Sequence, residues 1–256
     1  MGSINVAIVT GASKGIGRAI LERLARDGWR VVAAARDREA LGAVASGLTS
    51  KGFDVTAVPC DVTDERSVED AIALCKRVYG WPDLLVNNAG IPGATVATTA
   101  LERSDWDEVL AVNLTGAMIC CRAVLPGMLD RGSGHIVNIG SITGKRPLAY
   151  RVAYAASKLG LIGLTRSLAE EVGPEGVRVN AISPGPVFGD RIERVLQGQA
   201  EARNVSVEQA RADFTSAAPL RRFVEAEEVA DAVVALHALT GVTGADLNVA
   251  AGLVMY

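Results

Sequence analysis

Residues 6–17 read VAIVTGASKGIG, an aliphatic run that ends in a turn with three glycines. The apolar run predicts a short buried strand over Val6–Thr10. Gly11, Gly15 and Gly17 allow the backbone to turn sharply and to approach a ligand closely, and the helix that follows points its free N–H groups at that turn. A plain tight turn can also use such glycines. The strand before the turn and the helix after it favour the binding of a dinucleotide pyrophosphate.

The segment after the glycines has the period of an amphipathic helix. Ile16, Ile20 and Leu24 recur four residues apart and form one apolar stripe, while charged residues occupy the other face. The same alternation of short apolar runs with long Ala/Leu-rich segments continues along the chain. It predicts a single-domain α/β fold of the Rossmann type, with a doubly wound parallel sheet. Seven strands are expected, at Val6–Thr10, Trp29–Ala35, Asp54–Cys60, Leu84–Asn87, His135–Ile139, Val177–Ile182 and Leu247–Val249.

No linker, repeat or low-complexity tract divides the chain, so residues 1–256 are expected to form one dinucleotide-binding and catalytic domain. Residues 185–223 differ from the rest. They begin with Pro/Gly turn residues and continue with two charged, weakly amphipathic segments at Arg191–Gln199 and Val207–Phe214. A segment that interrupts the strand–helix alternation in this way is typical of a mobile lid over a binding site.

The composition limits the classes of partner. Of the 256 residues, 49% are hydrophobic and 21% are charged, which allows a large aliphatic core and excludes intrinsic disorder. The 26 basic residues are scattered among 29 acidic ones, so neither nucleic acid nor an anionic membrane is an expected partner. No signal peptide and no apolar stretch long enough for a membrane span are recognised, which predicts a cytoplasmic protein. Four cysteines without CxxC spacing and two histidines predict no metal site, and the cysteines are expected in the core.

Polar motifs follow the expected strands or lie on the expected helices. Beside the glycine turn, they are Asn87-Asn88-Ala89-Gly90 after the fourth strand, Asn113 in a long helix, Ser141 after the fifth strand, Tyr154 and Lys158 on one helix, and Pro184-Gly185 after the sixth strand. In this order and at these separations, they make the chain resemble the short-chain dehydrogenase/reductase family over essentially its whole length. Gly140-Ser141 and the end of the chain from Leu247 resemble the β-ketoacyl carrier-protein reductases and the polyketide ketoreductases.

Tyr154 and Lys158 lie four residues apart, so a helix places both side chains on one face. An ammonium group beside a phenol stabilises the phenolate and lowers its pKa from about 10, which makes tyrosine a usable acid or base near neutral pH. Without the other motifs, both would be interpreted as helix-surface residues. The resemblance implies that Tyr154 exchanges the proton with the carbonyl or alcohol oxygen, and that Lys158 also holds the nicotinamide ribose.

Ser141 and Asn113 complete the catalytic set that the resemblance implies. Ser141 stands at the carboxyl end of a strand, the edge where parallel sheets bind ligands, and its hydroxyl would orient the substrate oxygen. A turn serine next to Gly140 is the alternative interpretation. Asn113 would kink its helix and support a proton-relay water. From propensity alone, asparagine inside a helix is merely unfavourable.

The choice of cofactor follows from the charge at the end of the second strand. Ala35 stands where an acid would bind the 2′-hydroxyl of the NAD ribose, and Arg36 follows at once. Arg36, together with Lys14 in the glycine turn, offers positive charge to a 2′-phosphate, which favours NADP (NADPH). Asp37, one position after Arg36, is the observation that argues against NADP. It is expected to cap the next helix, but if it faced the ribose instead, NAD would be preferred.

The resemblance extends the cofactor site over the glycine turn, the ends of several strands and the Tyr–Lys pair. The residues expected to contact the cofactor are Gly11, Ser13, Lys14, Gly15, Ile16, Gly17, Arg36, Asp61, Val62, Asn88, Ala89, Gly90, Tyr154, Lys158, Pro184, Gly185 and Val187. Asp61 is implied as an adenine contact and is alternatively the cap of the next helix. Gly189 stands where the family commonly has a threonine. Ala250-Ala251-Gly252 stands where the family often has Asp-Gly-Gly, and this second change is expected to affect subunit packing more than chemistry.

The predicted function is NADP-dependent transfer of a hydride between nicotinamide and a ketone or secondary alcohol. The expected substrate is a small-molecule or carrier-bound carbonyl of the 3-oxoacyl or polyketide type. One alternative is an NAD-dependent polyol or hydroxy-acid dehydrogenase. Another is a regulatory protein that binds the cofactor without turnover, which the intact Ser141, Tyr154 and Lys158 argue against.

Self-association is a further expectation, because the resemblance implies a homotetramer or a homodimer. Two long helices are predicted at Trp106–Leu129 and Tyr154–Val172. Their outer faces are expected to carry enough apolar side chains to pair with a second copy. These side chains are Val109, Val124, Leu161 and Leu168.

Overall fold

The computed structural model describes residues 5–256 and contains a seven-stranded sheet in which all neighbouring strands are parallel. The strand order is β3-β2-β1-β4-β5-β6-β7. The predicted doubly wound sheet is confirmed, and every expected strand end lies within two residues of the observed one. The strands are β1 (Val6–Thr10), β2 (Arg30–Ala35), β3 (Val55–Pro59), β4 (Leu84–Asn87), β5 (Gly134–Ile139), β6 (Val177–Pro184) and β7 (Asp246–Val249).

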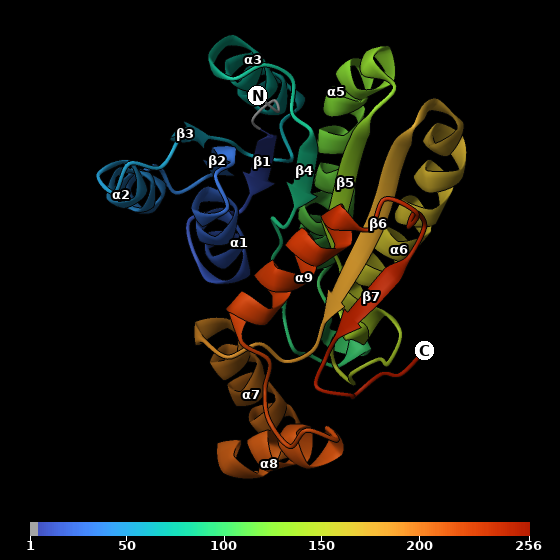
Figure 1. The fold of residues 1–256 in the computed structure, drawn as a ribbon. Helices are drawn as coiled ribbons and strands as arrows, with labels where there is room; N and C mark the ends of the chain where they lie inside the picture. The colour runs from blue at the N-terminus through green and yellow to red at the C-terminus, as the bar shows by residue number, and fades with distance from the viewer. Residues whose placement is uncertain (1–4) are drawn as a thin grey trace.

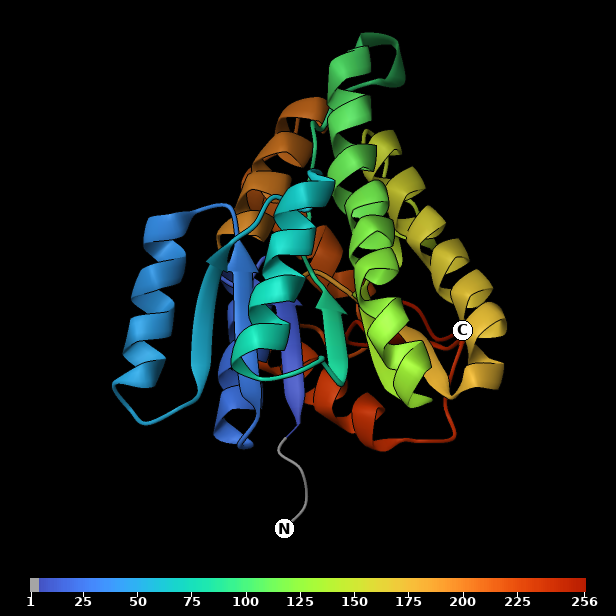
Figure 2. The same cartoon turned by 90° about the horizontal axis from the view of Figure 1, so that it is seen from above.

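Helices cover both faces of the sheet, as Figure 1 and Figure 2 show. Helices α1, α2 and α9 pack with one apolar cluster, and helices α3, α5 and α6 pack with the other. The helices are α1 (Gly15–Arg26), α2 (Arg38–Thr49), α3 (Glu65–Val78), α4 (Arg103–Leu110), α5 (Gly116–Arg131), α6 (Val152–Val172), α7 (Asp190–Arg203), α8 (Val207–Ala217) and α9 (Ala226–Ala238). Short 3₁₀ turns lie at Thr98–Ala100, Ile142–Gly144 and Gly173–Glu175.

The apolar stripe expected after the glycine turn holds α1 against the sheet. Ile20 and Leu24 are fully buried, and Ile16 packs at the edge of the same cluster. Burial of each such side chain contributes about 1.5–3 kcal/mol to the free energy of unfolding. The stripe thereby fixes the N-terminus of α1 directly beyond the end of β1.

The sheet reverses its order at β1, which lies between β2 and β4. Ile8 in β1 aligns with Val32 in β2 and with Leu85 in β4, so the three strands end at nearly the same level. Open parallel sheets bind ligands in the crevice outside the carboxyl ends of the strands at such a reversal. The predicted cofactor motifs therefore converge on one edge of the sheet.

Helices α4 and α5 are joined through a π-helical turn at Ala111–Thr115 into one continuous stretch. By length and composition alone, Arg103–Arg131 is apolar enough to cross a membrane, so the expectation that no stretch qualifies is wrong. In the structure, 44% of its most apolar window is buried, and α5 packs on α3, β4 and β5. Its apolar character is that of a core helix.

The apolar residues expected on the outer faces of the long helices lie inside the subunit instead. Val109, Val124 and Leu161 are at most 1% exposed, and Leu168 packs at the edge of a core cluster. Helices α5 and α6 carry apolar and small residues on most sides, so their periodicity does not mark which side faces the sheet. The expectation of an outward apolar stripe at these four residues is wrong.

Helices α7 and α8 form a small layer beyond the carboxyl ends of the strands (Figure 1). Leu196, Ala210 and Phe223 belong to an apolar cluster of their own. Gln199 Nε2 donates a hydrogen bond to the carbonyl oxygen of Ala149 at 2.9 Å, which ties α7 to the loop before α6. Both charged segments of the predicted lid are thus helices placed over the ligand-binding edge.

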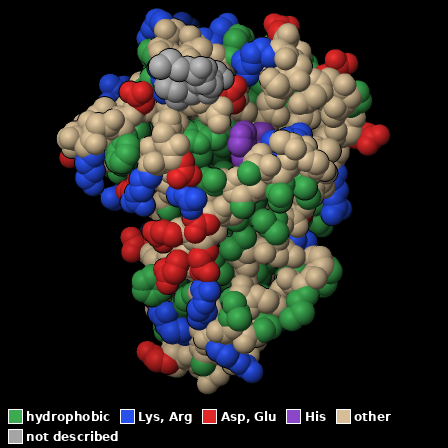
Figure 3. Space-filling view, in the orientation of Figure 1, with side chains coloured by type: hydrophobic (Ala, Val, Ile, Leu, Met, Phe, Trp, Pro, Cys, Tyr) green, Lys and Arg blue, Asp and Glu red, His purple; other side chains and the backbone are tan. Residues whose placement is uncertain are grey.

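Charged side chains of both signs are interspersed on the face that Figure 3 shows. Acidic side chains gather near the middle of this face, and the first turn of α9 carries Glu227 and Glu228. Figure 3 shows no broad basic field on this side of the molecule. Charge on this face offers no specific attraction to a polyanion.

The four cysteines are buried, as expected. The two histidines contact each other through their Nδ1 atoms at 3.3 Å. Burial, with the nearby charge of Arg178, lowers the pKa of His135 to about 2, so this histidine is neutral at physiological pH. Over residues 5–256, no three His, Cys, Asp or Glu side chains gather as a metal site would require.

Candidate active site

A cavity of about 1090 Å³ opens at the carboxyl ends of the strands. It extends from the glycine turn and the end of β2, along the ends of β4 and β5, to the lid helix α7. Every predicted cofactor or catalytic residue lines it except Asn113, which lies directly behind its wall. The residues singled out in the sequence are therefore brought together around one space.

The glycine turn lies against Asn88. The Asn88 side chain donates hydrogen bonds to the carbonyl oxygens of Thr10 and Gly11 at 2.9 and 3.2 Å. A Cβ atom on Gly17 would overlap both the Asn88 amide and the Gly11 carbonyl. Gly17 is required for this close approach, and Asn88 braces the turn from the end of β4.

The N-terminus of α1 is free to bind an anion. Lys14 at the N-cap makes no side-chain capping bond, and the first turn contains no acid. The unpaired N–H groups and the helix dipole therefore face the cavity without a competing carboxylate. This is the arrangement expected for a pyrophosphate site.

The end of β2 presents positive charge. Arg36 is exposed, lines the cavity and forms no ion pair or hydrogen bond with another side chain of residues 5–256. The carboxylate of Asp37 accepts a hydrogen bond from the backbone N–H of Ala40 at 3.0 Å as the N-cap of α2. The prediction that Asp37 caps this helix is confirmed, and Ala35 adds no negative charge.

Asp61 and Val62 lie at the end of β3 and line the same side of the cavity. Asp61 accepts hydrogen bonds from the backbone and the hydroxyl of Thr63, at 3.0 and 2.8 Å. Partial burial raises the pKa of Asp61, but these bonds and the charge of Arg36 outweigh it and leave the pKa below its ordinary value. The cap of α3 is Asp64, so the alternative role of Asp61 as a helix cap is wrong.

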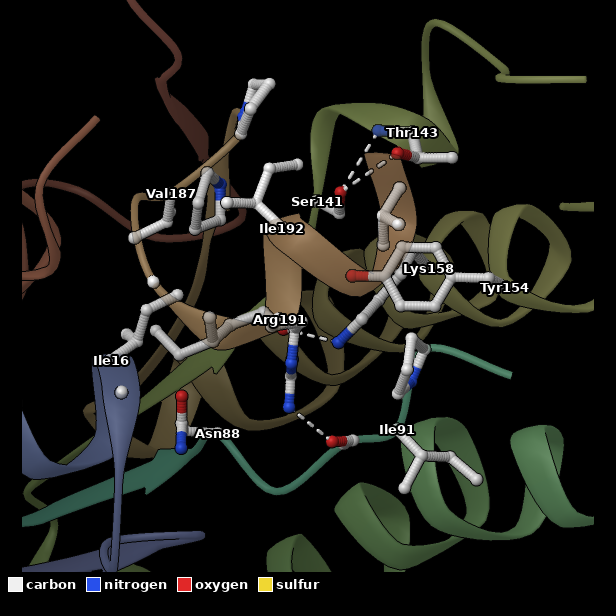
Figure 4. Close-up of a pocket in the computed structure, with 18 of the residues that line it drawn as sticks. Ile16, Asn88, Ile91, Ser141, Thr143, Tyr154, Lys158, Val187, Arg191 and Ile192 are labelled. Carbon is white, nitrogen blue, oxygen red and sulfur yellow. Dashed lines mark hydrogen bonds between the residues drawn. The ribbon is translucent and has the colours of Figure 1, made fainter. Parts of the chain in front are cut away.

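Tyr154 and Lys158 share one face of α6 and point into the cavity, as Figure 4 shows. Lys158 Nζ lies 5.8 Å from the centre of the Tyr154 ring and donates a hydrogen bond to the carbonyl oxygen of Ile139 at 2.8 Å. Burial raises the pKa of Tyr154, but the positive charges of Lys158 and Arg191 outweigh it, so the pKa lies below its ordinary value. Burial, together with Arg191, lowers the pKa of Lys158. The predicted acid–base pair thus has the environment that its chemistry requires.

Ser141 lies on the wall of the same cavity, near the hydroxyl end of the Tyr154 ring (Figure 4). Its hydroxyl oxygen accepts a hydrogen bond from the backbone N–H of Thr143 at 3.2 Å, which is the turn role considered as the alternative. The same side chain lines the cavity and contributes to the lowered pKa of Tyr154. The two interpretations of Ser141 are therefore compatible.

Asn113 occupies the π-helical turn between α4 and α5 and is buried. Its side chain accepts from the N–H of Ile91 at 2.8 Å and donates to the Ile91 carbonyl at 3.0 Å. It also donates to the Ser157 hydroxyl at 3.0 Å, and Ser157 donates to the Tyr154 carbonyl. Asn113 thereby joins the loop after β4 to the helix that carries Tyr154 and Lys158.

Pro184, the last residue of β6, lines the cavity together with Gly185 and Val187. Gly189 precedes α7 as its N-cap and has a φ of +128°, a conformation that side-chain-bearing residues rarely adopt. A threonine at this position would be strained, which gives a physical reason for this departure from the family pattern. The chain therefore enters α7 along a path that glycine permits.

Sequence reasoning missed an ion pair that supports the Ser141 loop. Lys145 Nζ lies 2.7 Å from a carboxylate oxygen of Asp246 at the start of β7, and both side chains are largely buried. The Ser183 hydroxyl donates to the other carboxylate oxygen at 2.6 Å. The three positions are far apart in the chain, so their spacing gave no signal.

Two arginines of the cavity were also missed. Arg191 in α7 donates to the Gly90 carbonyl at 2.7 Å and stands beside Tyr154 and Lys158 (Figure 4). Arg151 is buried, and its guanidinium lies 4.8 Å from the centre of the Tyr154 ring. Arg151 precedes Tyr154 by three residues, and side chains at this spacing lie close together on a helix. This spacing could have marked Arg151 as a neighbour of Tyr154 from the sequence.

Comparison with known proteins agrees with this geometry. The family model described as short chain dehydrogenase matches residues 5–200. The chain belongs to the short-chain dehydrogenase family. Its relatives include a granaticin polyketide synthase putative ketoacyl reductase of Streptomyces violaceoruber, with 41% identity over 98% of this chain and 93% of the relative. A 3-oxoacyl-[acyl-carrier-protein] reductase of Escherichia coli is 34% identical over 98% of this chain and 97% of its own length.

Solved structures of this family superimpose closely. The crystal structure of a variant actinorhodin polyketide ketoreductase with NADPH matches 99% of this chain and 98% of its own, with a TM-score of 0.94 and 38% identity. An NAD+-bound xylitol dehydrogenase matches with the same TM-score, 32% identity, and coverage of 97% and 98%. The chain is thus a short-chain oxidoreductase with the seven-stranded sheet of its family.

Proposed function

We propose that this short-chain dehydrogenase is an NADPH-dependent carbonyl reductase that interconverts a ketone and a secondary alcohol. The observation that carries the proposal is one cavity with two ends of different chemistry. Tyr154, Lys158 and Ser141 face one end, and Arg36, which forms no ion pair within residues 5–256, faces the other. The relatives named as ketoacyl reductases, and the structural neighbour determined with NADPH, support this assignment and a 3-oxoacyl or polyketide-type carbonyl as substrate.

The residues present fit NADPH. The uncapped N-terminus of α1 suits the pyrophosphate, and Arg36 with Lys14 suits the 2′-phosphate. Asp61 and Val62 would bound the adenine, while Gly90, Pro184, Gly185 and Val187 would surround the nicotinamide half. Lys158 would hold the nicotinamide ribose.

The chain's own groups supply the proton and orient the carbonyl. With the cofactor bound, the hydride comes from its reduced nicotinamide ring. The Tyr154 hydroxyl donates its proton to the carbonyl oxygen, and the Ser141 hydroxyl donates a hydrogen bond to the same oxygen. The ammonium of Lys158 stabilises the phenolate that remains on Tyr154. Asn113 fixes the position of the loop after β4 relative to α6, the helix that carries Tyr154 and Lys158.

A ketone panel tests the proposal. Purified protein is mixed with short-chain ketones, cyclic ketones and 3-oxoacyl thioesters, with NADPH and separately with NADH, and the absorbance of the reduced nicotinamide is followed. We expect NADPH oxidation that depends on a ketone. Binding of NADPH without any turnover over the panel would favour the regulatory protein, and turnover with NADH alone would favour an NAD-dependent dehydrogenase.

Arg36 is expected to set the cofactor preference. Charge-assisted hydrogen bonds contribute about 1.5–3 kcal/mol, so Arg36→Ala should weaken NADPH binding roughly tenfold to hundredfold and change NADH binding little. Replacing Ala35 by Asp together with Arg36→Ala should reverse the preference, because the carboxylate would accept the ribose hydroxyl and repel a phosphate. Fluorescence titration of both cofactors measures this.

Arg38→Ala is the matched control, because Arg38 is a neighbouring exposed arginine that does not line the cavity. It should leave both affinities unchanged. Equal losses for NADPH and NADH in Arg36→Ala would mean that Arg36 only supports the local structure.

We further propose that the protein is a cytoplasmic homo-oligomer, a homotetramer or a homodimer. The family resemblance suggests this assembly, and the subunit surface offers a different apolar region from the one expected. Leu247 on the edge strand β7 and Leu159 on α6 are exposed, as are the terminal Met255 and Tyr256. An unpaired edge strand with apolar side chains is a surface that proteins normally cover.

Light scattering after size exclusion at micromolar concentration should give a multiple of the 26.6 kDa subunit mass. Leu247→Lys should shift the distribution toward smaller species, because a charge on this edge opposes pairing. A monomeric mass for the parent protein would refute the assembly.

A further inference from the structure

Arg151 is a buried cation beside the catalytic tyrosine that lacks an anionic partner. The residue is 4% exposed and lines the cavity. Its Nη2 donates to the carbonyl oxygen of Pro92 at 2.8 Å. Its Nε is buried without a hydrogen-bond partner, and its Nη1 makes no hydrogen bond within residues 5–256. A guanidinium has five N–H donors, and here Nε is enclosed by protein, so the donors left for a ligand are those of Nη1 and the second N–H of Nη2.

No carboxylate of the described residues forms an ion pair with Arg151. The charged and titratable groups that act on it are Tyr154 and Arg191, and Arg191 has the same sign. Burial of a charge without a partner is costly, and buried arginines are normally paired. Arginine nevertheless stays protonated at neutral pH, so the site retains a positive charge that calls for an anion.

The surrounding wall of the cavity is also positive. Arg146, Arg191 and Arg194 line it near the lid, and Asp190 is the acid among them. Arg203 and Asp213, which line it further out, neutralise each other in an ion pair at 2.5 Å. The positive charge of this end of the cavity therefore attracts an anion. Among the arginines that line it, Arg151 is the one that is buried and without an ion-pair partner in residues 5–256.

We propose that Arg151 binds a carboxylate of the substrate, so that among carbonyl compounds of the 3-oxoacyl type this reductase prefers those with a free carboxylate to their neutral esters. The proposal rests on the carbonyl-reductase function and names its substrate class. The guanidinium lies 4.8 Å from the centre of the Tyr154 ring, so the carboxylate and the reacting carbonyl are a few bonds apart in one small molecule. A planar carboxylate can accept two N–H groups of one guanidinium, which an ester or a thioester cannot do with the same strength.

Matched substrate pairs test the proposal. Pyruvate, acetoacetate and levulinate place the carboxylate at three distances from the carbonyl, and the methyl ester of each removes the charge and keeps the carbon skeleton. The kcat/KM ratio of acid to ester is measured with NADPH for the parent and for Arg151→Gln. We expect the parent to prefer the acid in at least one pair. The variant should lower that ratio about tenfold to hundredfold, and Arg151→Lys should lower it less.

The acid-to-ester ratio of kcat/KM distinguishes direct binding of the substrate carboxylate by Arg151 from an indirect effect of Arg151 on Tyr154. A role in supporting Tyr154 alone would reduce turnover of acid and ester equally and leave the ratio unchanged, which would overturn the proposal. A parent that prefers the ester in all three pairs would overturn it as well. Arg166→Gln is the control, because Arg166 is exposed on the same helix and does not line the cavity. If Arg151→Gln does not fold, judged by circular dichroism, Arg151→Lys supplies the ratio.

The anion site can also be tested separately from the carbonyl-reductase activity. If no ketone is reduced with either cofactor, calorimetry of butyrate and butyramide still measures the anion site in the parent and in Arg151→Gln. Butyrate binding that exceeds butyramide binding, and that the variant loses, supports the site without the reaction. Equal binding of the two compounds overturns the site.

Discussion

Replacement of Tyr154 by phenylalanine should lower kcat for ketone reduction by about a hundredfold to ten-thousandfold, the range that general acid catalysis contributes. The substitution deletes the proton donor and keeps the ring, so the affinity for NADPH should change little. Steady-state kinetics and a cofactor titration on the same preparation measure both quantities. Comparable rates in variant and parent would remove Tyr154 from the mechanism.

Tyr79→Phe is a matched control. The Tyr79 hydroxyl also makes a hydrogen bond, to Thr56 at 2.9 Å, and Tyr79 does not line the cavity. Its removal should leave kcat unchanged. A loss in both variants would point to a general effect of removing a tyrosine hydroxyl.

The parent should also show a pH dependence that the variant lacks. Reduction requires the protonated phenol, so kcat/KM for the ketone should fall as the pH rises through the pKa of Tyr154. Nearby positive charge holds this pKa below its ordinary value, so the fall should begin below the range of a free tyrosine. Oxidation of the alcohol requires the phenolate and should rise over the same interval.

Lys158→Ala should lower both catalysis and cofactor affinity. The ammonium stabilises the phenolate of Tyr154 and would hold the nicotinamide ribose, so we expect about a hundredfold loss in kcat and about a tenfold loss in NADPH affinity. Its removal also leaves the buried Ile139 carbonyl without its donor, so a decrease in melting temperature should accompany these losses.

Lys51→Ala, at an exposed position in the turn after α2, is the control for loss of a lysine charge. It should change none of the three quantities. If Lys158→Ala lowered only the melting temperature, with kcat and cofactor affinity preserved, Lys158 would be a structural residue.

Local patterns were sufficient to predict the sheet and the placement of Tyr154 and Lys158 on one helix face at the cavity. The strand–glycine–helix pattern at 6–24 positioned α1, and the four-residue spacing of Tyr154 and Lys158 put both on one helix face. Asp37 was correctly predicted as a cap, because a cap forms with the backbone three residues ahead. These features depend on neighbours in the sequence.

Features that depend on distant segments were not predictable in the same way. The inward side of α5 and α6 depends on which neighbours they pack against, so Val124 and Leu161 were assigned to the wrong face. The Lys145–Asp246 pair joins a loop to the last strand, and its members are a hundred positions apart. The unpaired state of Arg151 became visible only when all its neighbours were known.

In the proposed reaction, a hydride from NADPH reaches the carbon of a substrate carbonyl in this cavity. Mass spectrometry of the alcohol, formed from a ketone and NADPH that carries deuterium in both C4 positions of the nicotinamide, tests it most directly. We predict an alcohol that carries deuterium on its carbinol carbon, with the hydroxyl proton supplied by solvent through Tyr154. An alcohol without deuterium, or no alcohol from any oxo acid or ketone in the panel, would contradict this function.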